Sequence, residues 1–424
     1  MTGGRRLAAA GAAGLAAAYG WTAARYAREQ ADGFSARGVP PAGSPEFGRV
    51  LESLTMTPVR EGNRVTILRN GVETFPSMLE AIEAAEHTVD FSSYIYWPGE
   101  ITERFTEAFV ERARSGVEVS VVLDGYGSAR LDRDTVRRME DAGVDVRFFR
   151  PPRWHSIGDA NNRMHRRLLV VDGRVGFAGG VGIADVWTGD AEDPEHWRET
   201  HARFEGPVVR DVLGGFLESW TDASRELRAG RRFPELEPFE GGCPVQVTRS
   251  SPLGGDTAVA QLFLLSLAAA RERVWMTTAY FTAGRRFLRA LCDASNRGVD
   301  VRILVNGRAV DKEVVRKTGQ RSYGPLLEAG VRIFEYDRTM LHAKTMVVDE
   351  SWSTLGSSNF DHRSFALDAE LNVAVYDRTV TEVLADHFRE DVKEARELDL
   401  DGWRSRPLRK RALEAAGELA RQSF

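Results

Sequence analysis

Two short segments of this chain, MHRRLLVVDG and LHAKTMVVDE, carry residues that could act on a phosphate ester. Each has a histidine, a basic residue two positions later and an aspartate seven positions later: His165, Arg167 and Asp172 in the first, and His342, Lys344 and Asp349 in the second. A phosphodiester reacts when its charge is neutralised, a nucleophile attacks in line and an acid protonates the departing oxygen. Two histidines and two cations supply these groups, so we expect both segments to share one active site.

Histidine suits both the nucleophilic and the acidic role because its pKa lies near neutrality. One imidazole can attack the phosphorus while the other, protonated, donates to the leaving group, so a covalent phosphohistidine is the expected intermediate. The cations come from side chains, and the sequence has no H-E-x-x-H motif, cysteine cluster or dense carboxylate group. We therefore predict that the reaction needs no cofactor and no metal.

The stretch after each histidine is apolar and β-branched, which predicts a strand. Residues i and i+2 share one face of a strand, so each histidine should point the same way as the basic residue that follows it. The two aspartates fall where the strands should turn, and Asp172-Gly173 is a typical hairpin dipeptide. Asp172 and Asp349 are candidate catalytic residues, and a role as turn residues is the alternative.

The duplication is longer than the motif. SGVEVSVVLDG around Gly116 matches RGVDVRILVNG around Gly298, and EDAGVDVRFF matches LEAGVRIFEY. In the same register WRETHARFEGPVV aligns with DAELNVAVYDRTV, which places Glu199 opposite Glu370. A carboxylate bonded to the far ring nitrogen of a histidine fixes its tautomer. We assign this role to both glutamates, and the alternative is that they are surface residues at strand ends.

The order of the elements predicts an α/β fold. Each half alternates helical segments, such as SMLEAIEAAEHT and AQLFLLSLAAARER, with short apolar strands, which indicates a mixed or mostly parallel sheet flanked by helices. The 424 residues are enough for two such domains. Composition changes divide the chain into a hydrophobic N-terminal segment at 1–30, a linker at 31–60 and domains at 61–238 and 239–424.

The chain resembles the phospholipase D superfamily and, within it, the bacterial cardiolipin synthases, over roughly residues 60 to 410. The segments that carry this resemblance are NNRMHRRLLVVDGRVGFAGG, HWRETHARFEGPVV, TAYFTAGRRFLRAL, MLHAKTMVVD and GSSNFDHRSFALDAELNVAVYD. The resemblance implies two homologous phospholipase D-like α/β domains related by pseudo-twofold symmetry, preceded by an N-terminal hydrophobic helix. It also implies that His165 is the nucleophile and His342 the general acid.

The activity that this resemblance implies is transfer of a phosphatidyl group, through phosphohistidine, from one phosphatidylglycerol to another with release of glycerol. The implied substrate-binding residues lie in the loops after the motif strands and after the first strand of the second half: Ser357, Asn359, Gly180, Gly182 and Tyr280. The first repeat departs from the family pattern, because Arg167 replaces the usual lysine and Gly182 an expected asparagine. Alternatives are therefore a phospholipase D-type hydrolase, a transphosphatidylase with another donor or acceptor, and a catalytically weakened membrane-associated homologue.

The ends of the chain and its charge suggest a membrane rather than a nucleic acid as partner. The net charge of −5 and the lack of a basic stripe interleaved with aromatic residues argue against nucleic-acid binding. RRLAAAGAAGLAAAYGWTAAR, at residues 5–25, predicts a single N-terminal anchor in a bacterial cell membrane, with a cleaved signal peptide or a peripheral helix as alternatives. WRSRPLRKRALE predicts a basic C-terminal helix that attracts anionic lipids such as phosphatidylglycerol, with a solvated helix face as the alternative.

Overall fold

The computed structural model describes residues 35–151, 162–251 and 258–406. The segment expected to be a membrane anchor and the basic residues from 407 onward lie outside these ranges. Across the described ranges, the structure contains no helix with the length and apolar character needed to cross a membrane.

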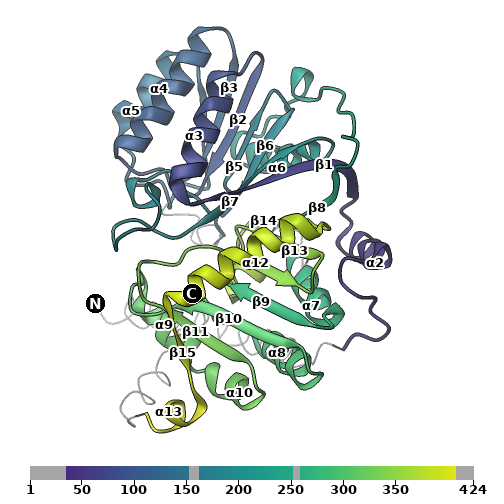
Figure 1. Cartoon of the computed structure of the whole chain (residues 1–424). Helices are drawn as coiled ribbons and strands as arrows, with labels where there is room; N and C mark the ends of the chain where they lie inside the picture. Colours follow the sequence, from purple (N-terminus) through teal and green to yellow (C-terminus); the bar gives the residue numbers. More distant parts are fainter. Residues whose placement is uncertain (1–34, 152–161, 252–257, 407–424) are drawn as a thin grey trace, which may run out of the picture.

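A single mixed sheet runs through the described part of the chain, in the order β15-β11-β10-β9-β12-β13-β14-β8-β1-β7-β6-β5-β2-β3-β4 (Figure 1). The strands of the first half are β1 (Val59–Arg69), β2 (Thr88–Ser93), β3 (Glu118–Asp124), β4 (Asp145–Phe149), β5 (Leu168–Val171), β6 (Val175–Gly179) and β7 (Thr200–Glu205). Those of the second half are β8 (Cys243–Ser250), β9 (Arg273–Thr277), β10 (Asp300–Asn306), β11 (Arg332–Tyr336), β12 (Thr345–Val348), β13 (Trp352–Gly356), β14 (Glu370–Val375) and β15 (Ala395–Leu398). From the centre of the sheet outward, the first half has the order β1-β7-β6-β5-β2-β3-β4 and the second half β8-β14-β13-β12-β9-β10-β11. Equivalent strands of the two halves therefore follow the same order.

Each half has three strands that pair in parallel and, nearer the centre, strands that pair antiparallel; the edge strand β15 of the second half is antiparallel to β11. The strands β2, β3 and β4 pair in parallel, as do β9, β10 and β11. The strands β5, β6 and β7, like β12, β13 and β14, pair antiparallel. The predicted mixed sheet is therefore confirmed, and in both halves the strand after the motif histidine is antiparallel to its neighbour β2 or β9.

Helices pack on the sheet in both halves (Figure 1). The first half has α3 (Asn70–Glu83), α4 (Glu100–Arg114), α5 (Arg133–Asp141), the short η2 (Asp185–Trp187), α6 (Val209–Ser224) and η3 (Gly230–Arg232). The second half has α7 (Ala258–Ala269), α8 (Arg285–Asn296), α9 (Glu313–Gln320), α10 (Tyr323–Glu328), α11 (His362–Ala366), α12 (Arg378–Lys393) and α13 (Leu400–Arg404). Their apolar faces form one hydrophobic cluster per half and a third cluster that draws residues from both halves. This third cluster joins the two halves by burial of apolar surface.

The strand β1 links the two halves of the sheet. Its first residues, Val59 and Arg60, pair with β8, whereas Arg64 to Arg69 pair with β7. The pairing with β8 shifts register between Arg60 and Asn63, and Gly62, which lies in this interval, has φ +73°. A side chain at Gly62 would overlap Pro238. Glycine therefore permits the bend that lets one strand serve both halves.

Part of the segment expected to be a linker, residues 31–60, is folded. It contains α2 (Pro45–Thr55), whose first turn is capped by the Ser44 hydroxyl accepting from the Phe47 backbone N–H at 3.1 Å. Phe47 and Leu51 are fully buried, and the Phe47 ring meets Trp352 edge to face at 5.9 Å. This helix packs on the second half, although it precedes the first half in sequence.

Candidate active site

The two motif histidines lie where the halves meet. Each precedes its predicted strand by three residues, because β5 begins at Leu168 and β12 at Thr345. The His165 backbone N–H donates to the carbonyl of Ala369 at 2.9 Å, and the His342 N–H donates to the carbonyl of Arg198 at 2.8 Å. Each motif histidine is therefore held by a backbone bridge to the opposite half.

These bridges set the partners of the two imidazoles, because Ala369 precedes Glu370 and Arg198 precedes Glu199. Nδ1 of His165 lies 2.9 Å from Oε1 of Glu370, and Nδ1 of His342 is hydrogen-bonded to Oε2 of Glu199. Both glutamates are fully buried, so the alternative that they are surface residues is wrong. Each half supplies the carboxylate for the histidine of the other half, a relationship that the sequence analysis did not anticipate.

The two basic residues complete this buried group of charges. Nη2 of Arg167 lies 3.0 Å from Nε2 of His165, and Nζ of Lys344 lies 3.0 Å from Nδ1 of His342. Lys344 is also 3.8 Å from Oε2 of Glu199. Arg167 and Lys344 are each 3% exposed. Two cations and two carboxylates thus surround the imidazoles.

Burial sets the protonation of this group before a substrate binds. Burial, with the Arg167 charge next in importance, holds the pKa of His165 well below its usual range. Burial and then the Lys344 charge do the same to the pKa of His342. Burial raises the pKa of both Glu199 and Glu370, and lowers the pKa of Lys344 to about 8. The substrate-free site therefore holds neutral imidazoles, and an arriving phosphate anion would favour protonation of one of them.

Aromatic side chains pack on both imidazoles. The Tyr94 ring meets His165 edge to face at 5.1 Å. The rings of Trp187 and Trp197 lie 5.3 and 5.6 Å from that of His342. Neither Trp187 nor Trp197 was predicted to lie at the site, although both fall in sequence between Gly182 and Glu199. These contacts restrict the rotation of the rings and exclude water from them.

The segment that carries Glu199 is anchored by Asn70 and Arg198. Asn70 adopts a left-handed φ of +59°, and its side-chain oxygen accepts from the Glu199 backbone N–H at 2.9 Å. Arg198 forms a buried ion pair at 3.0 Å with Asp391, which lies on α12 of the other half. The position of Glu199 thus depends on contacts with the second half as well as with α3.

The structure does not bring Asp172 and Asp349 to the histidines. They follow the far ends of β5 and β12, both at φ +53°. The Asp172 carboxylate accepts from the backbone N–H groups of residues 86–88, and the Asp349 carboxylate accepts from those of residues 271–273. Asp172 and Gly173 form the central pair of a hairpin turn, as the dipeptide predicted. This geometry supports the alternative that both aspartates are turn residues.

The loops after β6 and β13 differ at two positions. The Ser357 hydroxyl donates to Oε2 of Glu370, whereas the equivalent Gly180 has no room for a side chain because a Cβ there would overlap the Glu199 carboxylate. A Cβ at Gly182 would lie 2.9 Å from the Trp187 ring. The Trp187 ring therefore occupies the space that an asparagine side chain at position 182 would need, and this ring packs on His342.

Asn359 and Tyr280, the other two predicted binding residues, lie in the second half. Asn359 is 3% exposed, and its side-chain oxygen has no hydrogen-bond partner in the described part of the chain. A buried amide oxygen of this kind is costly unless a ligand satisfies it. Tyr280 follows β9 and donates its hydroxyl to Asp311 at 2.7 Å.

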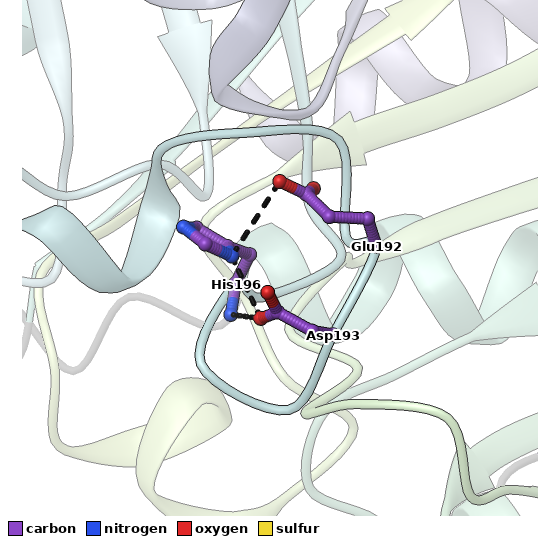
Figure 2. A group of neighbouring side chains, drawn as sticks. All are labelled: Glu192, Asp193 and His196. Atoms are coloured by element: carbon purple, nitrogen blue, oxygen red, sulfur yellow. Dashed lines mark hydrogen bonds and ion pairs between the residues drawn. The ribbon is translucent and has the colours of Figure 1, made fainter.

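A second polar group lies in the loop before Glu199 (Figure 2). Nδ1 of His196 is 2.7 Å from Oδ1 of Asp193 and 3.6 Å from Oε1 of Glu192. Among the described residues these three offer atoms close enough together for a metal ion. They are at least partly exposed and already bonded to one another. Their contacts therefore stabilise the loop without a metal ion.

The fold is shared with two solved structures. Phosphatidylserine synthase from Haemophilus influenzae Rd KW20 superposes with a TM-score of 0.64 at 14% identity, over 88% of this chain and 98% of that one. Polyphosphate kinase from Porphyromonas gingivalis superposes with a TM-score of 0.56 at 13% identity, over 93% of this chain and 57% of that one. At these identities the likeness concerns the fold alone.

Sequence comparison identifies the family. The family described as "Cardiolipin synthase, PLD-like domain" matches residues 78–186 and 264–392. The cardiolipin synthase of Geobacillus sp. (strain WCH70) is 33% identical over 366 residues, covering 86% of this chain and 73% of that protein. That of Geobacillus kaustophilus (strain HTA426) is 34% identical over 374 residues, covering 88% and 74%. The chain therefore belongs to the cardiolipin synthase family of PLD-like proteins, and the predicted resemblance is confirmed.

Proposed function

We propose that this protein is a phosphatidyltransferase of the cardiolipin synthase type, which joins two molecules of phosphatidylglycerol and releases glycerol. The observation that carries the proposal is the reciprocal pairing of His165 with Glu370 and of His342 with Glu199, with Arg167 and Lys344 beside them. This arrangement supplies a nucleophile, an acid and fixed cations in one buried group.

In the first step Nε2 of His165 attacks the phosphorus of the donor lipid. Glu370 holds the proton on Nδ1, which leaves the lone pair on Nε2 for the attack. The bond between phosphorus and the glycerol oxygen breaks as the P–N bond forms, and protonated His342 gives its proton to the departing oxygen. Glycerol leaves, and the phosphatidyl group stays on His165.

In the second step His342 acts as a base. It accepts the proton from a glycerol hydroxyl of a second phosphatidylglycerol, and that oxygen attacks the phosphorus of the phosphohistidine. The P–N bond breaks, its electron pair returns to Nε2 of His165, and cardiolipin is released. His342 is again protonated, so the cycle is closed without a cofactor.

The division of roles follows the family resemblance, which makes the histidine of the first repeat the nucleophile. Both glutamates have a second partner besides a histidine. Glu370 accepts from the Ser357 hydroxyl. Glu199 accepts from the Thr200 backbone N–H at 2.8 Å and lies 3.8 Å from the Lys344 ammonium.

The same proposal includes the setting of the enzyme. Two homologous domains related by pseudo-twofold symmetry are supported by the repeated strand order and by the reciprocal histidine contacts. Residues 1–30 would anchor the chain in the bacterial cell membrane, where its anionic substrates reside. The proposed substrate-binding residues are Ser357, Asn359, Gly180, Gly182 and Tyr280, together with the basic residues of the two motifs.

Product analysis tests the proposal. The purified full-length chain is incubated in detergent, with chelator, with phosphatidylglycerol as sole lipid, and products are identified by mass spectrometry. We expect cardiolipin and free glycerol in equal amounts, and only a small residual amount of both from His165→Ala or His342→Ala. Phosphatidic acid without cardiolipin would identify a hydrolase instead. No product from phosphatidylglycerol would favour a weakened homologue or another donor lipid.

A further inference from the structure

Lysine is rare in this chain, and one lysine outside the two motifs lies at the catalytic group. Of the 57 lysine and arginine residues, five are lysines. One of these is the motif residue Lys344, and another is Lys312, in the connection between β10 and α9. Two of the five ammonium groups thus belong to the same part of the molecule, that of Lys344 buried and that of Lys312 exposed.

Contacts with Tyr280 hold the loop that contains Lys312. Its Nζ lies 5.2 Å from the centre of the Tyr280 ring. The Tyr280 hydroxyl donates to both carboxylate oxygens of the adjacent Asp311, at 2.7 and 2.8 Å. Tyr280 in turn follows β9, the strand that pairs with the motif strand β12. The ring therefore fixes this loop at the edge of the catalytic group.

The charge of Lys312 is available to a ligand. Within the described ranges no carboxylate forms an ion pair with it, whereas Lys317, one turn further along α9, lies 3.5 Å from Glu313. After burial and the buried cations, Lys312 also contributes to lowering the pKa of both His165 and His342. Its ammonium is thus an exposed positive charge that acts on both imidazoles.

We infer that Lys312 binds the phosphate of the acceptor phosphatidylglycerol, an inference that rests on the proposed function. The attacking hydroxyl of the acceptor is separated from its own phosphate by the three carbons of glycerol, so a second anion must come close to the reacting phosphorus. Arg167 and Lys344 are engaged by the donor phosphate at that moment. Lys312 supplies the charge for the second phosphate just outside the buried group.

This role makes Lys312 a determinant of the product. Water competes with the acceptor hydroxyl for the phosphohistidine, and a neutral water molecule gains nothing from the ammonium. A charge-assisted hydrogen bond contributes about 1.5–3 kcal/mol, which corresponds to roughly a tenfold to hundredfold preference for the charged acceptor. Lys312 therefore favours transfer over hydrolysis.

The test is the ratio of cardiolipin to phosphatidic acid formed from phosphatidylglycerol micelles by the full-length enzyme. We expect Lys312→Ala to lower this ratio at least about tenfold, and Lys312→Arg to retain most of it. Lys317→Ala is the matched control, and its ratio should equal that of the wild type. The ratio compares two fates of one intermediate, so partial misfolding of a variant does not change it.

A neutral acceptor separates recognition of the phosphate from a general effect on transfer. With ethanol added, the ratio of phosphatidylethanol to phosphatidic acid should not distinguish Lys312→Ala from wild type. An unchanged cardiolipin ratio in Lys312→Ala, or an equal loss in Lys317→Ala, would overturn the inference while leaving the proposed function intact. Wild-type enzyme that makes phosphatidic acid but no cardiolipin would overturn both.

Discussion

Nδ1 of His165, in the first half of the chain, lies 2.9 Å from Oε1 of Glu370, in the second half. Glu370→Gln keeps the shape of this contact but removes the charge. We expect the rate of phosphohistidine formation to fall by at least about 10²-fold, because the nucleophilic tautomer is no longer enforced. Rapid quenching followed by mass analysis of the modified peptide measures this rate. Glu397→Gln, which breaks an exposed ion pair with Arg332, is the control.

A combined variant shows whether Glu370 acts through His165. Groups that act as one unit give effects that do not add. Glu370→Gln introduced into His165→Ala should therefore leave the residual activity unchanged. A further loss of 10-fold or more would mean that Glu370 contributes separately from the imidazole.

Ser357→Ala removes the hydroxyl that donates to Glu370. A hydrogen bond to a charged group contributes about 1.5–3 kcal/mol, so we expect turnover to fall roughly tenfold to a hundredfold. Ser353→Ala is the matched control, because Ser353 lies on β13, the strand that leads into the Ser357 loop, is fully buried and bonds to Thr381. Steady-state release of glycerol measures both variants, and equal losses would show that strand packing rather than the hydroxyl matters.

The repeat and the residues that could act on a phosphate were predictable because each motif lies within a short stretch of sequence. Continuous apolar, β-branched stretches after the motif histidines predicted β5 and β12, and the matching register of Glu199 and Glu370 in the two repeats predicted a pairing with histidine. The exchange of glutamates between halves was not predictable, because both arrangements have the same spacing in sequence. It depends on the bridges that join Met164 to Ala369 and Arg198 to Leu341, which are tertiary contacts.

The surroundings of Gly182, in the loop after β6, were not predictable from sequence either. The sequence shows only that a glycine replaces the asparagine of the family pattern, and it does not show which side chain lies beside it. In the structure the Trp187 ring occupies the space and packs on His342. The helix α2 within the expected linker was not predictable for a similar reason, since it is stabilised by packing Phe47 on the distant Trp352.

Gly182→Asn restores the asparagine that the family pattern has at this position, yet we expect it to harm the enzyme. The added Cβ would lie 2.9 Å from the Trp187 ring and 3.0 Å from Cβ of Ile95. Overpacking of this kind costs about 1–3 kcal/mol of unfolding free energy, and displacement of Trp187 should lower turnover as well. Urea unfolding and glycerol release measure the two effects. A gain in activity would show that the first repeat is weakened by the absence of the amide.

Asp349→Asn separates a structural role from a catalytic one. The Asp349 carboxylate accepts from the backbone N–H groups of residues 271–273, so loss of its charge should lower the unfolding free energy by about 1–3 kcal/mol. Turnover per enzyme molecule that forms phosphohistidine should stay within about twofold of wild type. A 10²-fold loss in this normalised turnover would instead place the aspartate in the reaction.

The pH dependence of the enzyme should follow Lys344, because burial lowers its pKa to about 8 from an ordinary 10.5. Above pH 8 the ammonium loses its proton and with it the charge that neutralises the phosphate, so kcat/KM should fall. Lys344→Arg keeps its charge at this pH, so whatever activity it retains should lack this alkaline decline.

Stability should move in the opposite direction over the same range. Between pH 8 and 10.5 the unfolded chain holds a proton on Lys344 that the folded chain has lost, so this group makes unfolding less favourable as pH rises. Burial of the protonated Lys344 destabilises the folded state fully below pH 8, and this destabilisation decreases as the pH rises above 8. Urea unfolding of wild type and of Lys344→Met at pH 7 and 9.5 isolates the contribution. An alkaline loss of activity that tracks loss of folded enzyme would contradict the assignment to Lys344.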